Sequence, residues 1–139
     1  MNRSVVGLAA LAMVGATVAG IRSVQGGMKS TQTVFLVNNG INGGYAYGDL
    51  GAVRNSADSS QMIACGAQGH SPGGTNATVV CWGYDSTLHY FSCLSAEVSV
   101  AQAVMAMTDS SEIFFQWDGS GHCQSVEVYN SSSYRPPTP

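Results

Sequence analysis

Apolar and polar residues alternate in several short stretches of this 139-residue chain, and each such stretch predicts a β-strand with one buried face. The clearest two, 113–117 (IFFQW) and 126–129 (VEVY), lie on either side of the glycine-rich sequence DGSG and therefore predict an antiparallel hairpin. Further strands are predicted by apolar runs at 33–37, 61–65, 78–82 and 88–93.

The stretch 77–93 (ATVVCWGYDSTLHYFSC) predicts a second hairpin, around which the other elements are expected to pack. Its two apolar arms are separated by Asp85, Ser86 and Thr87, which are residue types that favour turns. Residues 96–107 then place an apolar stripe at helical spacing, with Ser95 as the expected N-cap. We therefore predict one helix there.

Residues 40–49 (GINGGYAYGD) alternate glycines with Tyr45 and Tyr47, which period two places on one face. Two interpretations remain: a glycine-loosened loop or edge strand whose tyrosines cover the rim of the core, or a platform on which a ligand stacks. Residues 50–60 are polar, and Asp58 is a candidate cap of a helix or turn. Together the elements predict an α+β domain, in which an antiparallel sheet of five to six strands carries one helix on a face.

The start of the chain is typical of a secretory signal peptide, 1–19, because a basic residue precedes a small, apolar run and small residues lead up to Ala19. Cleavage there would make Gly20 the first residue of the mature protein. An uncleaved anchor is the alternative, although the uncharged run 4–21 only just reaches the length that spans a bilayer. The remainder is divided into a flexible lead-in at 20–32, a single domain at 33–130 and a Ser/Pro-rich tail at 131–139.

Charge is sparse: five basic residues stand against eight acidic ones, and charged residues make up 9% of the chain. The basic residues are scattered, so we expect neither nucleic acid nor, after signal cleavage, a membrane as a partner. A surface of neutral polar residues suits a secreted or periplasmic protein that touches glycans, other envelope polymers or copies of itself.

Four cysteines in an exported chain predict two disulfides, and their spacing contains no metal-binding knuckle, so no metal or cofactor is expected. Two pairings are considered. In the first, Cys65 bonds Cys81 and Cys93 bonds Cys123; in the second, Cys81 bonds Cys93 and Cys65 bonds Cys123. The entropy of loop closure is about equal for the two sets and does not distinguish them. The first set is preferred, because Cys65 and Cys81 are symmetric about Gly73, where a loop between paired strands would fold.

The sequence signatures of hydrolases, phosphate loops and dinucleotide sites are missing. A hydrolase could still assemble around His70, His89 or His122 with distant Asp and Ser side chains. We expect His70 and His122 in turns and His89 on a strand face, and no catalytic residue is assigned. The sequence DGSGH at 118–122 is interpreted as a hairpin turn, because it lacks the closing carboxylate of a calcium loop.

Aromatic residues are the best candidates for a binding surface, and Tyr45, Tyr47 and Tyr84 are singled out as ligand-binding residues. Trp82 shares a strand face with Tyr84 by period two. Nevertheless, Trp82 and Trp117 are both expected in the core, where tryptophan is usually found.

Three features of the chain carry a resemblance: the sequence GDLGAVRNSADSSQMIAC, the three cysteines that follow it, and the sequence FFQWDGSGHCQSVEVYNSS. These features are similar to those of a group of small exported bacterial proteins that share a four-cysteine arrangement. That group has no assigned activity, so the resemblance implies export and disulfides and transfers no functional residue.

The function predicted from the sequence is that of a secreted, non-enzymatic module that binds envelope polymers or glycans, or that assembles with itself. The alternatives are a small extracellular hydrolase that uses a histidine, and a protein inhibitor that presents residues 68–75 as a disulfide-braced loop.

Overall fold

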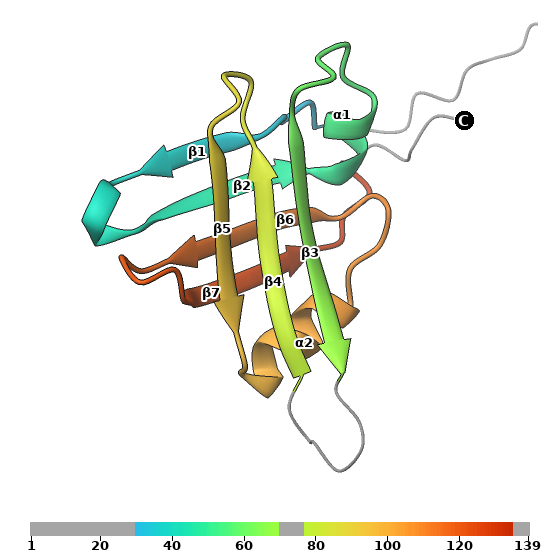
Figure 1. Cartoon of the computed structure of the whole chain (residues 1–139). Helices are drawn as coiled ribbons and strands as arrows, with labels where there is room; N and C mark the ends of the chain where they lie inside the picture. Colours follow the sequence, from blue (N-terminus) through green and yellow to red (C-terminus); the bar gives the residue numbers. More distant parts are fainter. Residues whose placement is uncertain (1–29, 70–76, 135–139) are drawn as a thin grey trace, which may run out of the picture.

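A computed structural model describes residues 30–69 and 77–134 of the chain (Figure 1). Several sequence predictions lie outside these residues: the signal peptide at 1–19, the mature start at Gly20, most of the lead-in, His70, most of the proposed inhibitor loop and the end of the tail.

The described residues form seven strands in two antiparallel sheets that lie one across the other (Figure 1). The four-stranded sheet has the order β1 (Phe35–Asn38), β2 (Gly44–Asp49), β6 (Glu112–Trp117) and β7 (Cys123–Tyr129). The three-stranded sheet consists of β3 (Met62–Gly69), β4 (Ala77–Tyr84) and β5 (Tyr90–Ser95). Antiparallel sheet and few helices are confirmed, whereas the prediction of a single sheet of five to six strands is wrong.

The division into two sheets follows from how much apolar strand surface has to be covered. Strands of both sheets bury every second residue, for example Val79 and Cys81 on β4 and Ile113 and Phe115 on β6. One short helix is too small to cover such a surface, so the apolar face of one sheet covers that of the other.

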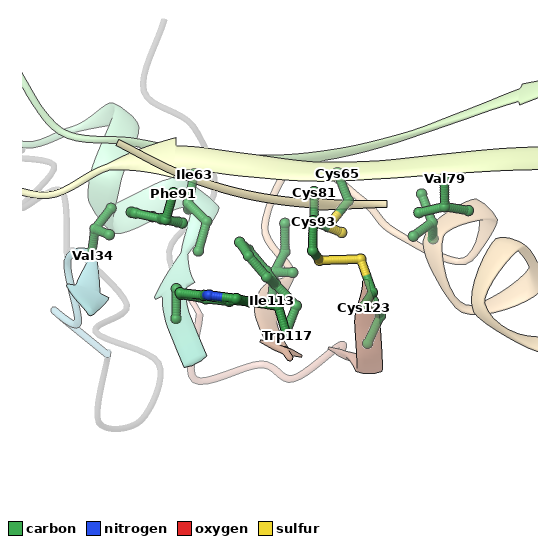
Figure 2. Packing of buried hydrophobic residues seen from close by; sticks show 14 of the residues in the cluster. Val34, Ile63, Cys65, Val79, Cys81, Phe91, Cys93, Ile113, Trp117 and Cys123 are labelled. Atoms are coloured by element: carbon green, nitrogen blue, oxygen red, sulfur yellow. A yellow bond between two sulfur atoms is a disulfide. The ribbon is translucent and has the colours of Figure 1, made fainter. Parts of the chain in front are cut away.

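Aromatic rings form the centre of the contact between the sheets. Phe91 of β5 stacks on Trp117 of β6 with ring centroids 5.9 Å apart and lies 5.7 Å from Phe115 (Figure 2). All three side chains are buried, which confirms the prediction that Trp117 lies in the core.

The glycine-rich stretch folds as the 3₁₀ helix η1 (Gly40–Asn42) followed by β2, which lies between β1 and β6. The interpretation as a loop or edge strand is therefore wrong. The glycines make room for large partners: a Cβ on Gly44 would lie 2.7 Å from the Trp117 ring and 2.2 Å from the carbonyl oxygen of Val37. Small inward residues thus allow Trp117 to enter the core, while Tyr45 and Tyr47 point outward together, as predicted.

There are two α-helices in the described chain, not one. Helix α1 (Leu50–Arg54) begins at Asp49, whose Oδ1 accepts a hydrogen bond of 3.0 Å from the backbone N–H of Ala52. Asp58, the candidate cap of a helix or turn, caps a turn: its Oδ1 accepts a hydrogen bond of 2.9 Å from the N–H of Ser60.

Helix α2 (Val98–Met105) is shorter than the predicted 96–107, and its N-cap is Glu97 and not Ser95. The Ser95 hydroxyl accepts a hydrogen bond of 3.1 Å from the N–H of Glu97, one turn before the helix begins. The helix contacts β3, β4 and β7, which are strands of both sheets, and so closes one end of the core (Figure 1).

The turn of the central hairpin is longer than predicted. The Asp85 carboxylate accepts hydrogen bonds from the N–H groups of Thr87 and His89, and Leu88 adopts a φ of 64°. These interactions keep residues 85–89 in the turn, so β5 begins at Tyr90 rather than at Leu88. His89 accordingly lies in the turn and not on a strand face.

Both disulfides have the preferred pairing: Cys65 with Cys81, and Cys93 with Cys123. The first joins residues that already face each other across β3 and β4, with Cα atoms 4.0 Å apart. The second joins β5 to β7 and is a covalent link between the two sheets (Figure 2). Cys81 also faces Cys93 in the strand register, so it has two possible disulfide partners and is bonded to Cys65.

Candidate functional site

The outward side of the four-stranded sheet carries a row of aromatic side chains, which we call the aromatic face. It begins on β1, where the Phe35 ring lies 5.1 Å from that of Tyr47 and 6.3 Å from that of Tyr45. The row continues to β6 through Tyr45 and Phe114, whose rings stack at 5.9 Å. Phe35 is 42% exposed, so the row is accessible to solvent.

Beyond Phe114 the face is hollowed into a shallow depression of about 470 Å³. Four aromatic residues and two glutamates line it: Tyr47, Glu112, Phe114, Glu127, Tyr129 and Tyr134.

Strand register assembles this depression. Phe114 faces Tyr47 on one neighbouring strand and Glu127 on the other, while Glu112 faces Tyr129. Tyr134 comes from the turn at 131–134, which the sequence assigned to the tail and in which the Tyr134 N–H donates to the carbonyl of Ser131.

Neighbouring groups shift the pKa values of Glu112 and Tyr129 in the depression. Burial raises the pKa of Glu112; a hydrogen bond from the Tyr134 hydroxyl opposes this shift, and the nearby Asp49 carboxyl adds to it. The Tyr129 hydroxyl donates to Oε2 of Glu127, and this bond raises the pKa of Tyr129. The second oxygen of Glu127 accepts a hydrogen bond of 3.3 Å from the Ser125 hydroxyl.

Asp49 lies beneath the depression as the cross-strand partner of Glu112. Its side chain is fully buried, and its Oδ2 has no hydrogen-bond partner within residues 30–69 and 77–134, although Oδ1 caps α1. A buried polar oxygen without a partner is costly, so this carboxyl is an unusual feature at the base of an exposed surface.

The outward side of the three-stranded sheet is a second, separate surface, which we call the neutral face. Trp82 and Tyr84 lie there together, as period two predicts, and the Tyr84 ring is 5.2 Å from that of Tyr90. The prediction that Trp82 lies in the core is therefore wrong. Tyr84 does not join Tyr45 and Tyr47, because the two faces belong to opposite sheets.

The cysteine pattern contained the signal that would have corrected Trp82. Cys81 has to point inward to bond Cys65, and neighbouring strand residues point to opposite faces, so Trp82 has to point outward. Glu112 and Glu127 could be found in the same way, because each alternates with residues predicted to be buried. Tyr134 carries no such signal, since a turn outside the sheet brings it into place.

The described histidines form local pairs within turns. Nδ1 of His89 lies 3.2 Å from Oδ2 of Asp85 and 2.9 Å from the Thr87 hydroxyl, and the His89 side chain is 74% exposed. A hydrolase triad needs the acid at one ring nitrogen and the hydroxyl at the other, whereas here both contact the same nitrogen. His122 lies 3.6 Å from Asp118 and is also exposed.

Two places resemble metal sites in composition. The sulfur atoms of Cys81, Cys93 and Cys123 lie within 4.8 Å of one another, but each is bonded in a disulfide and none is a thiolate. In the predicted DGSG turn, Asp118 Oδ1 accepts hydrogen bonds from the N–H groups of Ser120 and His122, so the carboxylate closes the turn.

Comparison of the chain with protein-family models, with curated proteins and with solved structures finds no match. Within residues 30–69 and 77–134, no helix has the length and apolar character needed to cross a membrane. The fold and the site therefore define the protein only by class: a two-sheet, disulfide-bonded domain with an aromatic, acidic outer face.

Proposed function

We propose that the protein is a secreted, non-enzymatic binding module, and that its aromatic face binds a glycan of an envelope polymer. The observation that carries this proposal is the continuous row of Phe35, Tyr47, Tyr45 and Phe114 on an accessible sheet surface. Sugar rings present flat patches of C–H groups, and aromatic rings arranged along a surface can stack on several such patches in succession.

The rigidity of this surface supports the proposal. The rings stand on β1, β2 and β6, and the other side of these strands packs into the core through Ala46 and Phe115. A ligand would therefore meet side chains that are already held in position, which reduces the entropy lost on binding. Two disulfides also suit an extracellular or periplasmic location, and the proposed export signal and the resemblance to exported bacterial proteins agree with it.

Affinity electrophoresis in gels that contain individual soluble polysaccharides tests this function. Phe114→Ala should lower the affinity for the retarding polymer by about tenfold, the effect of removing a central aromatic contact. Tyr90→Ala, which removes an exposed aromatic from the neutral face, is the matched control and should leave the affinity for the polymer unchanged. Equal losses in both variants, or retardation by no polymer of a broad set, would contradict the proposal.

Self-assembly through the neutral face is the second candidate function. This face presents exposed apolar side chains on β3 and β5: Met62, Tyr90 and Leu94, which are 38%, 55% and 52% exposed. Exposed apolar patches on a sheet mark contact surfaces. Sedimentation velocity over a range of protein concentrations distinguishes the two functions, because Leu94→Asp should abolish association without affecting glycan binding.

A further inference from the structure

The depression at the β6–β7 side of the aromatic face combines two kinds of group that attract cations. Aromatic rings present a negative face to a cation, and here Phe114 and Tyr129 stand beside the carboxyl groups of Glu112 and Glu127. Glu112 is half-buried, so water screens its interaction with a cation less than that of the exposed Glu127. A neutral ligand would use only the rings.

Basic side chains that could neutralise these acids are scarce in the described chain. All eight acidic residues fall within it, together with a single arginine and no lysine. That residue, Arg54 of α1, lines a different depression, next to Asp58 and Gln61. The described histidines pair with Asp85 and Asp118 in turns, and neither lines the depression.

Asp49 is a second and independent observation that points to a cation. Among the described residues its fully buried Oδ2 lacks a hydrogen-bond partner, and the Asp49 carboxyl adds to the raised pKa values of Glu112 and Tyr134, which line the depression. Three acidic groups thus lie close together on one side of one sheet. A cation in the depression would offset the repulsion between Asp49 and Glu112 and interact favourably with the lining carboxylates of Glu112 and Glu127.

We propose that this depression binds the ammonium group of an amino sugar, so that the glycan recognised by the aromatic face carries free amines. The sugar ring stacks on Phe114 and Tyr47, and the ammonium N–H groups donate to the carboxylates of Glu112 and Glu127. This inference rests on the proposed glycan-binding function and specifies the ligand class. An N-acetylated sugar offers an amide at the same position and gains nothing from the acids.

Isothermal titration calorimetry with two matched oligosaccharides tests the inference. The probes are a β-linked N-acetylglucosamine oligomer and its fully de-N-acetylated counterpart, in slightly acidic buffer that keeps the amines protonated. The wild-type protein should bind the amino oligomer about tenfold more tightly than the acetylated one, the effect of a cation–π contact supported by charged hydrogen bonds. The preference should weaken as salt is added.

Variants separate the charge effect from the stacking effect. The double variant Glu112→Gln with Glu127→Gln should bind both oligomers equally, with its affinity for the acetylated form unchanged. Glu97→Gln removes an exposed acid at the start of α2 that does not line the depression, and it is the matched control that keeps the preference. Phe114→Ala should weaken the binding of both oligomers, because it acts on stacking.

The outcomes distinguish the inference from the proposed function. Equal affinity of the wild type for both oligomers would overturn the ammonium site and leave glycan binding intact, whereas binding of neither would overturn both for this class of polymer. Choline and its uncharged carbon isostere, dimethylbutanol, probe the depression without a sugar. Binding of choline but not of the amino oligomer would refute the ligand class.

Arg135 is next to Tyr134 in the chain but lies outside the described residues. A variant at this position tests whether its guanidinium group occupies the depression. Arg135→Gln should leave the preference for the amino oligomer unchanged. A large gain in affinity for the amino oligomer in that variant would show that the chain supplies its own cation to the depression, and this would overturn the inference.

Discussion

Removing the disulfide between Cys93 and Cys123 should destabilise the protein more than removing the one between Cys65 and Cys81. The two bonds differ in what they hold. Cys65 and Cys81 face each other on paired strands, so the sheet keeps them close without the bond. Cys93 and Cys123 lie on different sheets, which are otherwise joined mainly by side-chain packing and by a hydrogen bond of 2.9 Å from Leu94 N–H to the Gly121 carbonyl.

Chain entropy sets the starting magnitude. The separations of 16 and 30 residues correspond to about 3 and about 4 kcal/mol of stabilisation through restriction of the unfolded chain. The entropy difference alone is below 1 kcal/mol. Loss of the link between the sheets adds to the larger value, so we expect a gap of about 1 to 2 kcal/mol between the two deletions.

Double alanine variants are needed for this comparison. In a Cys65→Ala chain the remaining Cys81 thiolate would lie within 4.8 Å of both sulfurs of the other disulfide. It can attack the sulfur of Cys93, forming a bond between Cys81 and Cys93 and releasing Cys123 as the thiolate. Peptide mapping of that single variant should therefore find part of the free thiol at Cys123.

Urea unfolding of the two double variants, followed by tryptophan fluorescence, gives the free energies of unfolding. The Cys93→Ala, Cys123→Ala protein should have the lower midpoint. A lower midpoint for the Cys65→Ala, Cys81→Ala protein would refute the reasoning, because the bond within one sheet would then matter more than the bond between sheets. Equal midpoints would show that packing alone holds the sheets together.

Three further predictions concern the core, the central turn and export. Phe115→Ala should lower the free energy of unfolding by about 3 to 5 kcal/mol, measured by urea unfolding, because it empties the centre of the contact between the sheets. Burial alone would raise the pKa of Asp85, but hydrogen bonds from Thr87 and His89 outweigh it and lower the pKa to about 2. The stability that Asp85 provides is therefore present above pH 3.8, the pKa of this carboxyl in the unfolded chain, and is lost as the pH falls toward 2. The difference in melting temperature between wild type and Asp85→Asn should shrink over that range. A constant difference would contradict this reasoning. N-terminal sequencing of exported protein should begin at Gly20, and a sequence that begins at Met1 would show that the leader is retained.

Periodicity predicted the strands well, because burial of one face leaves a clear alternation in sequence. Ile113, Phe115 and Trp117 showed which side of β6 is buried, and the structure confirms it. Alternation does not show what covers that side. A helix and a second sheet satisfy the same pattern, which is why one sheet was predicted where there are two.

The hardest residues to predict were those whose role depends on a contact with a residue distant in sequence. The Trp117 ring, which is distant in sequence, occupies the place where a side chain at position 44 would lie, so only glycine fits there. Because the sequence does not show this contact, the glycines at 40–49 indicated a loop. The candidate site was predicted in part: Tyr45 and Tyr47 were placed together, but Glu112 and Glu127 were passed over because acids opposite a buried face usually only contact solvent. Their significance depends on Tyr134 and Asp49, which only the fold brings near.

The two outer faces differ in charge, and this difference favours one orientation of the protein as it approaches a charged surface. Glu112 and Glu127 lie on the outer face of the four-stranded sheet, whereas the described outward residues of β3, β4 and β5 carry no charge. Within the described residues, this difference in charge gives the two sheets a dipole moment, which orients a diffusing protein in the electric field of a charged surface. We therefore expect a cationic polymer to meet the aromatic face first and an anionic polymer to meet the neutral face first, so that the sign of the surface decides which side of the protein arrives at it.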